Sequence, residues 1–254
     1  MSRPLALVVA APGTNRDADV SLALDLAGAE PRVVLLAELL ADPKLLRAAR
    51  MLVLPGGFSH ADSLGAGRMF GLRLSLGLGE LLHGFVADGR PVIGICNGFQ
   101  VLVRTGLLPG NGLHAALGPN SGGHFDCRWV RLAPASRRCI WTAPLLDGPG
   151  GGGGADAEIH CPIAHGEGRF ACDATTLDAL RANDQVALTY ASANPNGSLA
   201  DIAGICDPTG LVLGLMPHPE NHVLPRQHPL AQRGQGRGSG LALFHNGVSH
   251  AKEL

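Results

Sequence analysis

Short, continuously apolar runs in the first half of the chain constrain its fold more than any other feature. The runs are LALVVA (5–10), RVVLL (32–36), MLVLP (51–55) and PVIGI (91–95). Apolar runs without alternation are typical of strands that are buried on both faces of a parallel sheet. Between them, 17–30 has helical spacing, and Asp42-Pro43 opens a short helix with Pro43 at its first position. Alternating strands and helices predict an α/β fold.

The second half of the chain predicts strands of a different kind. The stretch FDCRWVRLA (125–133) alternates like a half-exposed antiparallel strand. Three further strands are expected at 186–191, 199–205 and 211–217. The sequence Asp207-Pro208-Thr209-Gly210 is typical of the turn between the last two. The glycine-rich stretch 147–158 is typical of a flexible linker or loop tip.

These patterns predict one domain over residues 1–254, with a mostly parallel central sheet flanked by helices and a β-rich insertion in the second half. The compact core is expected to cover about residues 5–224. The glycine-rich loop 148–154 and a C-terminal extension, 225–254, lie outside this core. Within the extension, GLALFHNGV (240–248) is typical of a final helix that packs back on the domain.

Composition and charge exclude several classes of protein. The 254 residues are 46% apolar and 16% charged, with a formal net charge of −1 and no block of like charges. The basic surface expected of a nucleic-acid-binding protein is therefore missing, and 4% aromatic residues argue against a base-stacking surface. No apolar run approaches the ~18 residues that span a bilayer.

Cysteine spacing indicates a reducing compartment. The six cysteines form no CxxC pair and no zinc spacing, and the chain is longer and less cysteine-dense than a secreted disulfide scaffold. The N-terminal stretch MSRPLALVVAAPG superficially resembles a signal peptide, but its apolar part is short and ends in Pro12-Gly13. We therefore expect reduced thiols, a cytoplasmic location and no metal site.

Cys96 lies where the fourth apolar run gives way to a helix. Gly94 and Gly98 flank it in the G-x-nucleophile-x-G pattern of a strained strand-to-helix turn. Such a turn presents the side chain at the edge of the sheet, and the helix N-terminus favours a thiolate. The backbone N–H of Asn97 would then face a developing oxyanion. The alternative, that Cys96 simply packs in the core, suits most free cysteines, and the two glycines argue against it here.

A partner for the thiol is expected at the end of the last apolar run, in Met216-Pro217-His218-Pro219-Glu220. Each proline disfavours helical backbone for the residue before it, and in an extended segment positions i and i+2 point to the same side. Glu220 can therefore accept from one nitrogen of His218 while the other nitrogen faces Cys96. The alternative is a solvated loop histidine, which is the better interpretation for most of the eleven histidines.

A third element, Pro55-Gly56-Gly57-Phe58-Ser59, follows the third apolar run. Its glycines would let backbone amides approach a ligand and complete an oxyanion hole. Because Gly-Gly is common in ordinary turns, the position of this segment after a strand is stronger evidence for a ligand site than its glycines are. All three elements follow strands, and ligands of parallel sheets bind beyond the carboxyl ends of the strands.

Together LPGGFS, GICNGFQ and MPHPE resemble the class I, or triad, glutamine amidotransferases. Further segments narrow the resemblance, from about residue 5 to residue 220, to the glutaminase subunit of phosphoribosylformylglycinamidine synthase in purine synthesis. These segments are PGTN (12–15), GLLPG (106–110), the stretch from Asn120 through FDCRWV, PIAHGEGRF (162–170), ANPNGS (193–198) and IAGI (202–205). The resemblance implies the class I amidotransferase fold, with flavodoxin-like layering.

The resemblance also implies a reaction. Cys96 would attack the carboxamide of glutamine to give a glutamyl thioester and ammonia, and water would then release glutamate. His218 would act as general acid and base, oriented by Glu220. The backbones of Gly57 and Asn97 would hold the oxyanion.

Substrate and partner contacts follow from the same resemblance. Gln100 would help to fix the substrate. His165 and Arg169 would contribute to a docking surface or to the ammonia path, although an ordered loop suits their stretch almost as well. A separate synthetase subunit would use ATP and Mg²⁺ to convert formylglycinamide ribonucleotide to the amidine, and a small third subunit would bridge the two. No cofactor is expected on this chain, which has no GxxxxGK[ST] loop.

The sequence departs from the family pattern in places. After Ser59 the family usually has Tyr-Gly-Asp-Tyr-Leu-Arg, whereas this chain has HADSLG at 60–65, which lacks both tyrosines and the arginine but keeps Asp62. Arg16 stands where a cysteine is common, and Asn221 stands where an arginine usually follows the glutamate. None of these changes touches the expected triad.

Two other functions stay open at this point. A stand-alone cysteine hydrolase of related fold would act on another amide or ester without a synthetase partner. A non-catalytic scaffold would be expected to have lost Cys96, His218 or Glu220, and all three are present. The remaining cysteines, including Cys127 and Cys161, are expected to be packing residues.

Overall fold

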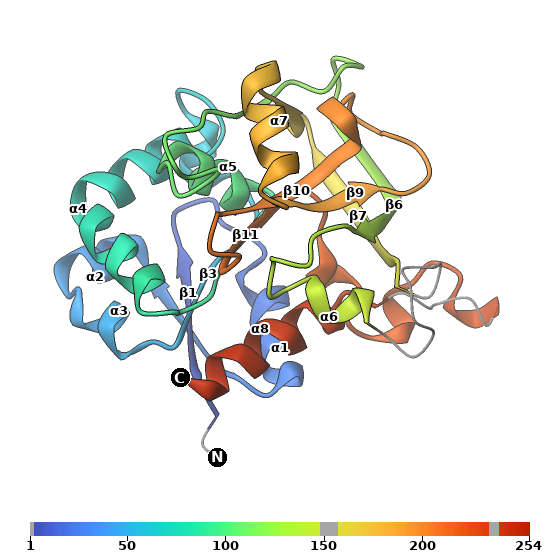
Figure 1. Ribbon diagram of the computed structural model, residues 1–254. Coiled ribbons are helices and arrows are strands. Elements are labelled where there is room, and N and C mark those ends of the chain that lie inside the picture. Colours follow the sequence, from blue (N-terminus) through green and yellow to red (C-terminus); the bar gives the residue numbers. More distant parts are fainter. Residues whose placement is uncertain (1–2, 148–156, 234–238) are drawn as a thin grey trace.

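A nine-stranded mixed sheet runs through the computed structural model, which describes residues 3–147, 157–233 and 239–254 (Figure 1). Its strand order is β2-β1-β3-β4-β11-β10-β9-β6-β7. The strands are β1 (Leu5–Ala10), β2 (Glu30–Leu35), β3 (Met51–Leu54), β4 (Val92–Ile95), β6 (Asp126–Pro134), β7 (Ile159–His165), β9 (Val186–Tyr190), β10 (Ile202–Cys206) and β11 (Val212–Leu215). A separate two-stranded sheet pairs β5 (Ala116–Gly118) with β8 (Arg169–Ala171).

The large sheet has a parallel half and an antiparallel half. Strands β1, β2, β3, β4 and β11 pair in parallel, whereas β10, β9, β6 and β7 continue the sheet in antiparallel pairs. The predicted α/β class, with a mostly parallel centre and a β-rich second half, is confirmed. The four apolar runs form β1 to β4, and the predicted turn at 207–210 joins β10 to β11.

Helices flank the sheet (Figure 1). They are α1 (Asp17–Ala27), α2 (Leu36–Ala41), α3 (Lys44–Ala48), α4 (Arg68–Ala87), α5 (Asn97–Arg104), α6 (Ala143–Leu146), α7 (Ala174–Ala182) and α8 (Leu241–Glu253). The described ranges also contain five short 3₁₀ turns: η1 (Ser59–Asp62), η2 (Leu199–Asp201), η3 (Pro219–Asn221), η4 (Pro225–Gln227) and η5 (Ala231–Arg233). Helix α1 packs against α8, and α4 packs against α5 (Figure 1). In the described part of the chain, no helix is long and apolar enough to cross a membrane.

Several element boundaries differ from the prediction. Pro43 is the N-cap of α3 rather than its first residue, which is within the usual uncertainty of a helix boundary. Strand β2 is not buried on both faces, since Val33 is 45% exposed and Leu35 is 50% exposed. The reason is that β2 forms an edge of the sheet.

Strand β7 was not predicted, and it completes the opposite edge. Its burial alternates along Ile159–His165, with Cys161 and Ile163 inside. Pro162 lies in its middle, and a proline disfavours a strand except at the edge of a sheet. Because β7 is an edge strand, it accommodates the proline.

The predicted C-terminal helix is present and packs back on the domain. Helix α8 buries Leu243, Phe244 and Val248. Gly247 lets the ring of Trp141 come close, because a Cβ on Gly247 would lie 2.2 Å from a carbon of the indole ring. The predicted glycine-rich loop at 148–154 lies outside the described residues.

Candidate active site

Cys96 forms the turn between β4 and α5, in a conformation that L residues rarely adopt, with φ 51° and ψ −107°. The flanking glycines are required by close backbone approach. A Cβ on Gly98 would lie 1.9 Å from the carbonyl oxygen of Leu54, and one on Gly94 would lie 2.6 Å from the carbonyl oxygen of Gly98. Strain of this kind is typical of functional turns. The sulfur lies 3.9 Å from the carbonyl oxygen of Ala164.

His218 and Glu220 form a buried hydrogen-bonded pair just after β11. Nδ1 of His218 lies 2.7 Å from Oε1 of Glu220, and their side chains are 3% and 0% exposed. A carboxylate accepts hydrogen bonds, so Nδ1 carries the hydrogen and Nε2 is directed elsewhere. Among the described residues Nε2 has no hydrogen-bond partner, and the imidazole ring and Cβ of Cys96 both lie against Gly56. The structure therefore brings together the three residues predicted as a triad.

The pKa of His218 is raised to about 10. Burial by itself would lower this pKa, because it disfavours the charged imidazolium. The negative charges of Glu220 and Cys96, and the hydrogen bond to Glu220, outweigh the effect of burial. At neutral pH the imidazole is therefore a cation that can donate a proton at the sulfur.

Gly56 is a site residue that the sequence prediction missed. A Cβ at this position would lie 2.8 Å from Cε1 of His218 and 3.4 Å from Cβ of Cys96. The side chains of His218 and Cys96 therefore both pack against Gly56, and any larger residue there would displace the imidazole. Both glycines of Pro55-Gly56-Gly57 were predicted to bring backbone amides to a ligand, but it was not predicted that Gly56 makes room for the imidazole.

The two backbone N–H groups that were predicted to form an oxyanion hole belong to Asn97 and Gly57. Asn97 is the first residue of α5, so its N–H has no acceptor within the helix. Gly57 forms an isolated antiparallel bridge with Thr14. The hydrogen bonds of this bridge are donated by Phe58 and Asn15, which leaves the N–H of Gly57 outside the bridge.

A chain of amide hydrogen bonds extends from the nucleophile turn to the loop after β7. Asn97 donates to Gln100 (3.0 Å) and to Asp62 (3.3 Å), and Gln100 donates to the carbonyl oxygen of Glu167 (2.6 Å). Burial raises the pKa of the Asp62 carboxyl, and the negative charge of Glu167 raises it further. Gln100 therefore links the turn to a region where two carboxylates approach each other.

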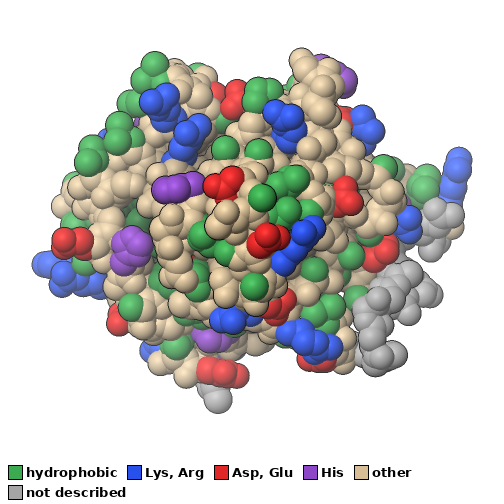
Figure 2. All heavy atoms as spheres, turned by 45° about the horizontal axis from the view of Figure 1, so that its top comes forward, with side chains coloured by type: hydrophobic (Ala, Val, Ile, Leu, Met, Phe, Trp, Pro, Cys, Tyr) green, Lys and Arg blue, Asp and Glu red, His purple; other side chains and the backbone are tan. Residues whose placement is uncertain are grey.

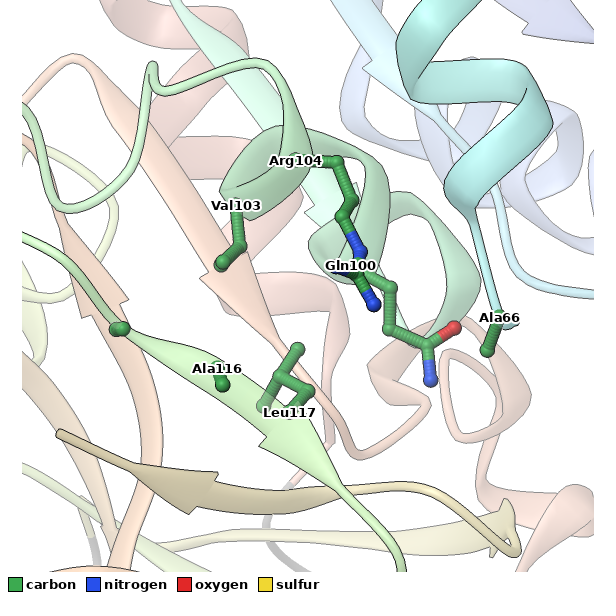
Figure 3. A pocket seen from close by; sticks show the side chains of 7 residues that line it. Ala66, Gln100, Val103, Arg104, Ala116 and Leu117 are labelled. Carbon is green, nitrogen blue, oxygen red and sulfur yellow. The ribbon is translucent and has the colours of Figure 1, made fainter. Parts of the chain in front are cut away.

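Gln100 also lines a cavity of about 200 Å³ between α5, β5 and Ala66. In Figure 3 the amide of Gln100 points toward Ala66, and the guanidinium of Arg104 extends beside it. The remaining walls are small or apolar, and they are formed by Val103, Ala115, Ala116 and Leu117. The residue predicted to fix the substrate thus lies between the nucleophile turn and an open space.

His165 and Arg169 lie in different environments. His165 is 3% exposed, and its Nδ1 lies 3.0 Å from Oδ1 of Asn120, which also accepts from the N–H of Gly168. Burial and the positive charge of His218 lower the pKa of His165 to about 4. Arg169 is exposed on β8. The two residues therefore do not form one surface.

Aromatic side chains are exposed on two loops, the one after β3 and the one before β6. Phe58 is 46% exposed and Phe125 is 49% exposed, with ring centroids 6.3 Å apart. Phe58 follows Gly57, and Phe125 approaches Gly166, the neighbour of His165.

Charged side chains of both signs are mixed on the face that the top of Figure 1 presents. Figure 2 shows the blue Lys and Arg side chains interspersed with the red Asp and Glu side chains, with no large area of one sign.

The departures from the family pattern at Arg16 and Asn221 meet at one carboxylate. Nη1 of Arg16 lies 3.1 Å from Oδ2 of Asp19, and Nδ2 of Asn221 donates to the same oxygen at 3.0 Å. Asn221 is the residue after Glu220. Arg16, the N-cap of α1, and Asn221 therefore both contact the carboxylate of Asp19.

The other five cysteines differ in exposure, and Cys172 is partly exposed. Cys139, Cys161 and Cys206 are buried, as expected for packing residues, and burial raises the pKa of Cys161 well above its usual value. The packing interpretation is wrong for Cys127, which is exposed, because side chains of β6 alternate between the interior and solvent. Within the described ranges, no group of three or more His, Cys, Asp or Glu side chains is arranged to hold a metal ion.

Comparison with known proteins identifies the family. Residues 3–251 match the family described as CobB/CobQ-like glutamine amidotransferase domain. The phosphoribosylformylglycinamidine synthase subunit PurQ of Treponema denticola is 45% identical over 98% of this chain and 99% of its own length. The PurQ subunit of Dehalococcoides mccartyi is 40% identical over the full length of both chains.

A solved structure agrees with both. A chain in the structure of PurLQS from Thermotoga maritima superposes with a TM-score of 0.75 and 33% sequence identity, covering 97% of this chain and 98% of that one. Family match, full-length relatives and superposition all include the turn at Cys96 and the strand end at His218. The chain is therefore a glutamine amidotransferase and belongs to the family of PurQ subunits of phosphoribosylformylglycinamidine synthase.

Proposed function

We propose that this chain is the glutaminase subunit of phosphoribosylformylglycinamidine synthase and that Cys96, His218 and Glu220 hydrolyse glutamine. The observation that carries the proposal is the buried 2.7 Å pair of His218 and Glu220 beside a cysteine on a strained turn. A cation paired with a carboxylate next to a thiol supplies both a nucleophile and a proton donor.

The reaction proceeds in two steps. The Cys96 thiolate attacks the carboxamide carbon, and the oxyanion is held by the N–H groups of Gly57 and Asn97. His218 gives its proton to the leaving nitrogen, so ammonia departs and a glutamyl thioester remains. In the second step His218, now neutral, takes a proton from water as the water attacks the thioester. Glutamate and the free thiol are released, and the sum is glutamine plus water to glutamate plus ammonia.

Gln100 holds the substrate in this proposal. Its side chain is fixed by Asn97 and the carbonyl oxygen of Glu167, so it is ordered before glutamine binds. Preorganised polar groups lose little entropy on binding. His165 lies on the interior side and suits the ammonia path, whereas Arg169 is exposed and suits a docking surface.

Ammonia is delivered to a separate synthetase subunit, which uses ATP and Mg²⁺ to convert formylglycinamide ribonucleotide to the amidine. A small third subunit bridges the two chains. The PurLQS structure of Thermotoga maritima supports an assembly with a PurL partner. Exposed Phe58 and Phe125 near the nucleophile support docking on this side, since exposed aromatic residues are enriched in interfaces.

The test of the catalytic proposal is a substitution in a reconstituted complex. Cys96→Ser should abolish amidine synthesis with glutamine, while ammonium salts still support it. Cys127→Ser, which changes an exposed thiol, is the matched control and should leave glutamine-dependent synthesis intact. Normal use of glutamine by the Cys96→Ser protein would remove the nucleophile from the mechanism.

A second experiment tests the docking side. Phe125→Ser should weaken binding of the synthetase in a sedimentation or interferometry assay. Leu76→Ser is the matched control, because Leu76 is 80% exposed on α4, outside the loops that carry Phe58 and Phe125. Equal binding by the two variants would contradict docking through the Phe58–Phe125 pair.

A further inference from the structure

Three histidines surround Trp129 where the chain leaves the segment that carries His218 and Glu220, here called the catalytic turn. His222 follows η3, His160 belongs to β7, and His228 belongs to the segment 222–233, here called the strap. Their ring centroids lie 5.3, 5.2 and 4.9 Å from the indole of Trp129, in edge-to-face geometry. His222 and His228 are buried, with exposed fractions of 0% and 6%. This cluster plays no part in the proposed chemistry.

Hydrogen bonds fix the protonation of two of these rings. The backbone N–H of Leu230 donates to Nδ1 of His228 at 3.1 Å, so Nδ1 has a lone pair and no hydrogen. The hydrogen of neutral His228 is therefore on Nε2, which lies 2.9 Å from Nδ1 of His160. Nδ1 of His160 must accept this hydrogen bond. The arrangement is consistent only when both imidazoles are neutral.

The charges around His160 oppose its protonation. On one side, His160 faces Arg131 of β6, which pairs with Glu158 at 3.5 Å. On the other side, it faces the imidazoles of His222 and His228. Burial lowers the pKa of His160, and these neighbours lower it further. Arg226, the charged residue of η4, is exposed. A proton on Nδ1 of His160 would face the N–H of His228 and break the contact.

The strap is joined to the catalytic turn through His222. Nδ1 of His222 donates to the carbonyl oxygen of His160. The carbonyl oxygen of His222 accepts from Ser239 Oγ at 2.9 Å and from the N–H of Gly240 at 2.7 Å. Strand β7 in turn holds the catalytic histidine, because the carbonyl oxygen of Pro162 accepts from the N–H of His218 at 2.8 Å. The cluster thus links three segments that meet at the proposed active site.

We propose that His160, His222 and His228 form a latch that holds the strap and the catalytic turn against β7 while Nδ1 of His160 accepts from His228, and that protonation of His160 at this nitrogen releases the strap. The three histidines are positioning residues rather than catalytic ones. The latch itself does not depend on the proposed function, and only its effect on activity does.

Hydrogen exchange of the strap tests the latch in the wild-type chain. As pH falls below about 6.5, amides of 222–233 should exchange faster, after correction for the intrinsic rate, by about tenfold for each pH unit below the midpoint, as expected for linkage to one proton. The double variant His160→Gln, His228→Gln retains an uncharged donor and acceptor and should keep the strap protected at pH 5. His228→Ala should expose it at pH 7.5. His83→Gln, at an exposed histidine of α4, is the control and should behave as wild type.

Two readouts separate the latch from the proposed function. Trp141→Phe leaves Trp129 as the single indole, whose emission should change at the same pH as the exchange. Glutaminase activity should fall reversibly over that range in wild type and persist in the double glutamine variant. Strap exchange that is independent of pH, or identical in wild type and the double variant, would overturn the latch. Opening of the strap with unchanged activity would overturn its link to the catalytic turn, whereas absence of activity at every pH would count against the proposed function alone.

Discussion

At the scale of single residues, two imidazoles in the active-site region have pKa values driven in opposite directions. Glu220 holds the pKa of His218 at about 10, and burial beside the cationic His218 lowers the pKa of His165 to about 4. Because the two pKa values are shifted in opposite directions, His218 is charged and can donate a proton at neutral pH, whereas His165 is neutral. In the proposed mechanism His218 therefore carries the proton of the reaction, and His165, which is proposed to line the ammonia path, is uncharged at neutral pH.

Glu220→Gln tests the electrostatic part of this account. Without the carboxylate, burial dominates and the pKa of His218 falls, so the imidazolium is no longer available to protonate the leaving nitrogen. We predict a loss in kcat of about a hundredfold or more, with a small change in KM. Glu80→Gln, at an exposed glutamate of α4, is the control. A kcat for Glu220→Gln equal to that of the control would show that the pair is not needed.

The raised pKa of His218 also predicts how stability depends on pH. The folded chain binds this proton more tightly than the unfolded chain, whose histidine has a pKa of about 6.5. The contribution is therefore complete below pH 6.5 and is lost as pH rises through about 10. Urea unfolding should show a loss on the order of a few kcal/mol between pH 6.5 and 10 that is absent in His218→Gln. Equal pH dependence in the two proteins would mean that His218 is not held as a cation.

At the scale of elements, the sequence predicted those strands and turns that depend mainly on residues close together in the chain. Apolar runs located β1, β3 and β4, and the glycines around Cys96 located the turn, because both depend on neighbours in the chain. Strand β7 escaped prediction because Pro162 suggests a loop unless the strand is known to be an edge. The exposed face of β2 was missed for the same reason, since position in a sheet is not encoded within one strand.

Contacts between segments that are far apart in the chain could not be predicted from the sequence patterns. Gly56 matters because His218, far along the chain, approaches its Cα. Asp19 matters because Arg16 and Asn221 converge on it. The triad itself was predictable because prolines and glycines restrict the backbone at each strand end and the parallel sheet brings those ends together.

Gly56→Ala tests the meeting of two strand ends. The added methyl group would lie 2.8 Å from Cε1 of His218 and should displace the ring from the sulfur. We predict a fall in kcat of about a hundredfold, since a misplacement near 1 Å costs that much. Gly79→Ala is the matched control, with nothing within 4 Å of its added Cβ, and should stabilise α4 by about 0.5–1 kcal/mol. Full activity of Gly56→Ala would place the ring elsewhere.

At the scale of the whole molecule, the C-terminal helix joins the two halves of the chain. Helix α8 packs on α1 and contacts β3 and η3, so the last residues support the same strand ends that carry the site (Figure 1). Phe244 and Val248 are fully buried. Residues 241–253 therefore belong to the structural core, as the packing predicted for 240–248 requires, and the core extends beyond the predicted boundary at about residue 224.

Phe244→Ala measures this contribution. Removing a fully buried phenyl ring should lower the free energy of unfolding by about 3–5 kcal/mol, through lost transfer energy and the cavity left behind. Leu254→Ala removes a side chain that is 42% exposed and should change it by less than about 0.5 kcal/mol. Similar urea midpoints for the two variants would show that α8 is peripheral.

In the proposed mechanism, Cys96 is the thiol that attacks the carboxamide of glutamine. A glutamine-analogue electrophile, followed by peptide mapping of all six cysteines, tests it most directly. The account predicts one adduct per chain, on Cys96, that excess glutamine prevents, although Cys127 is more exposed. Labelling of Cys127 in its place, or labelling of Cys96 that glutamine does not prevent, would contradict it.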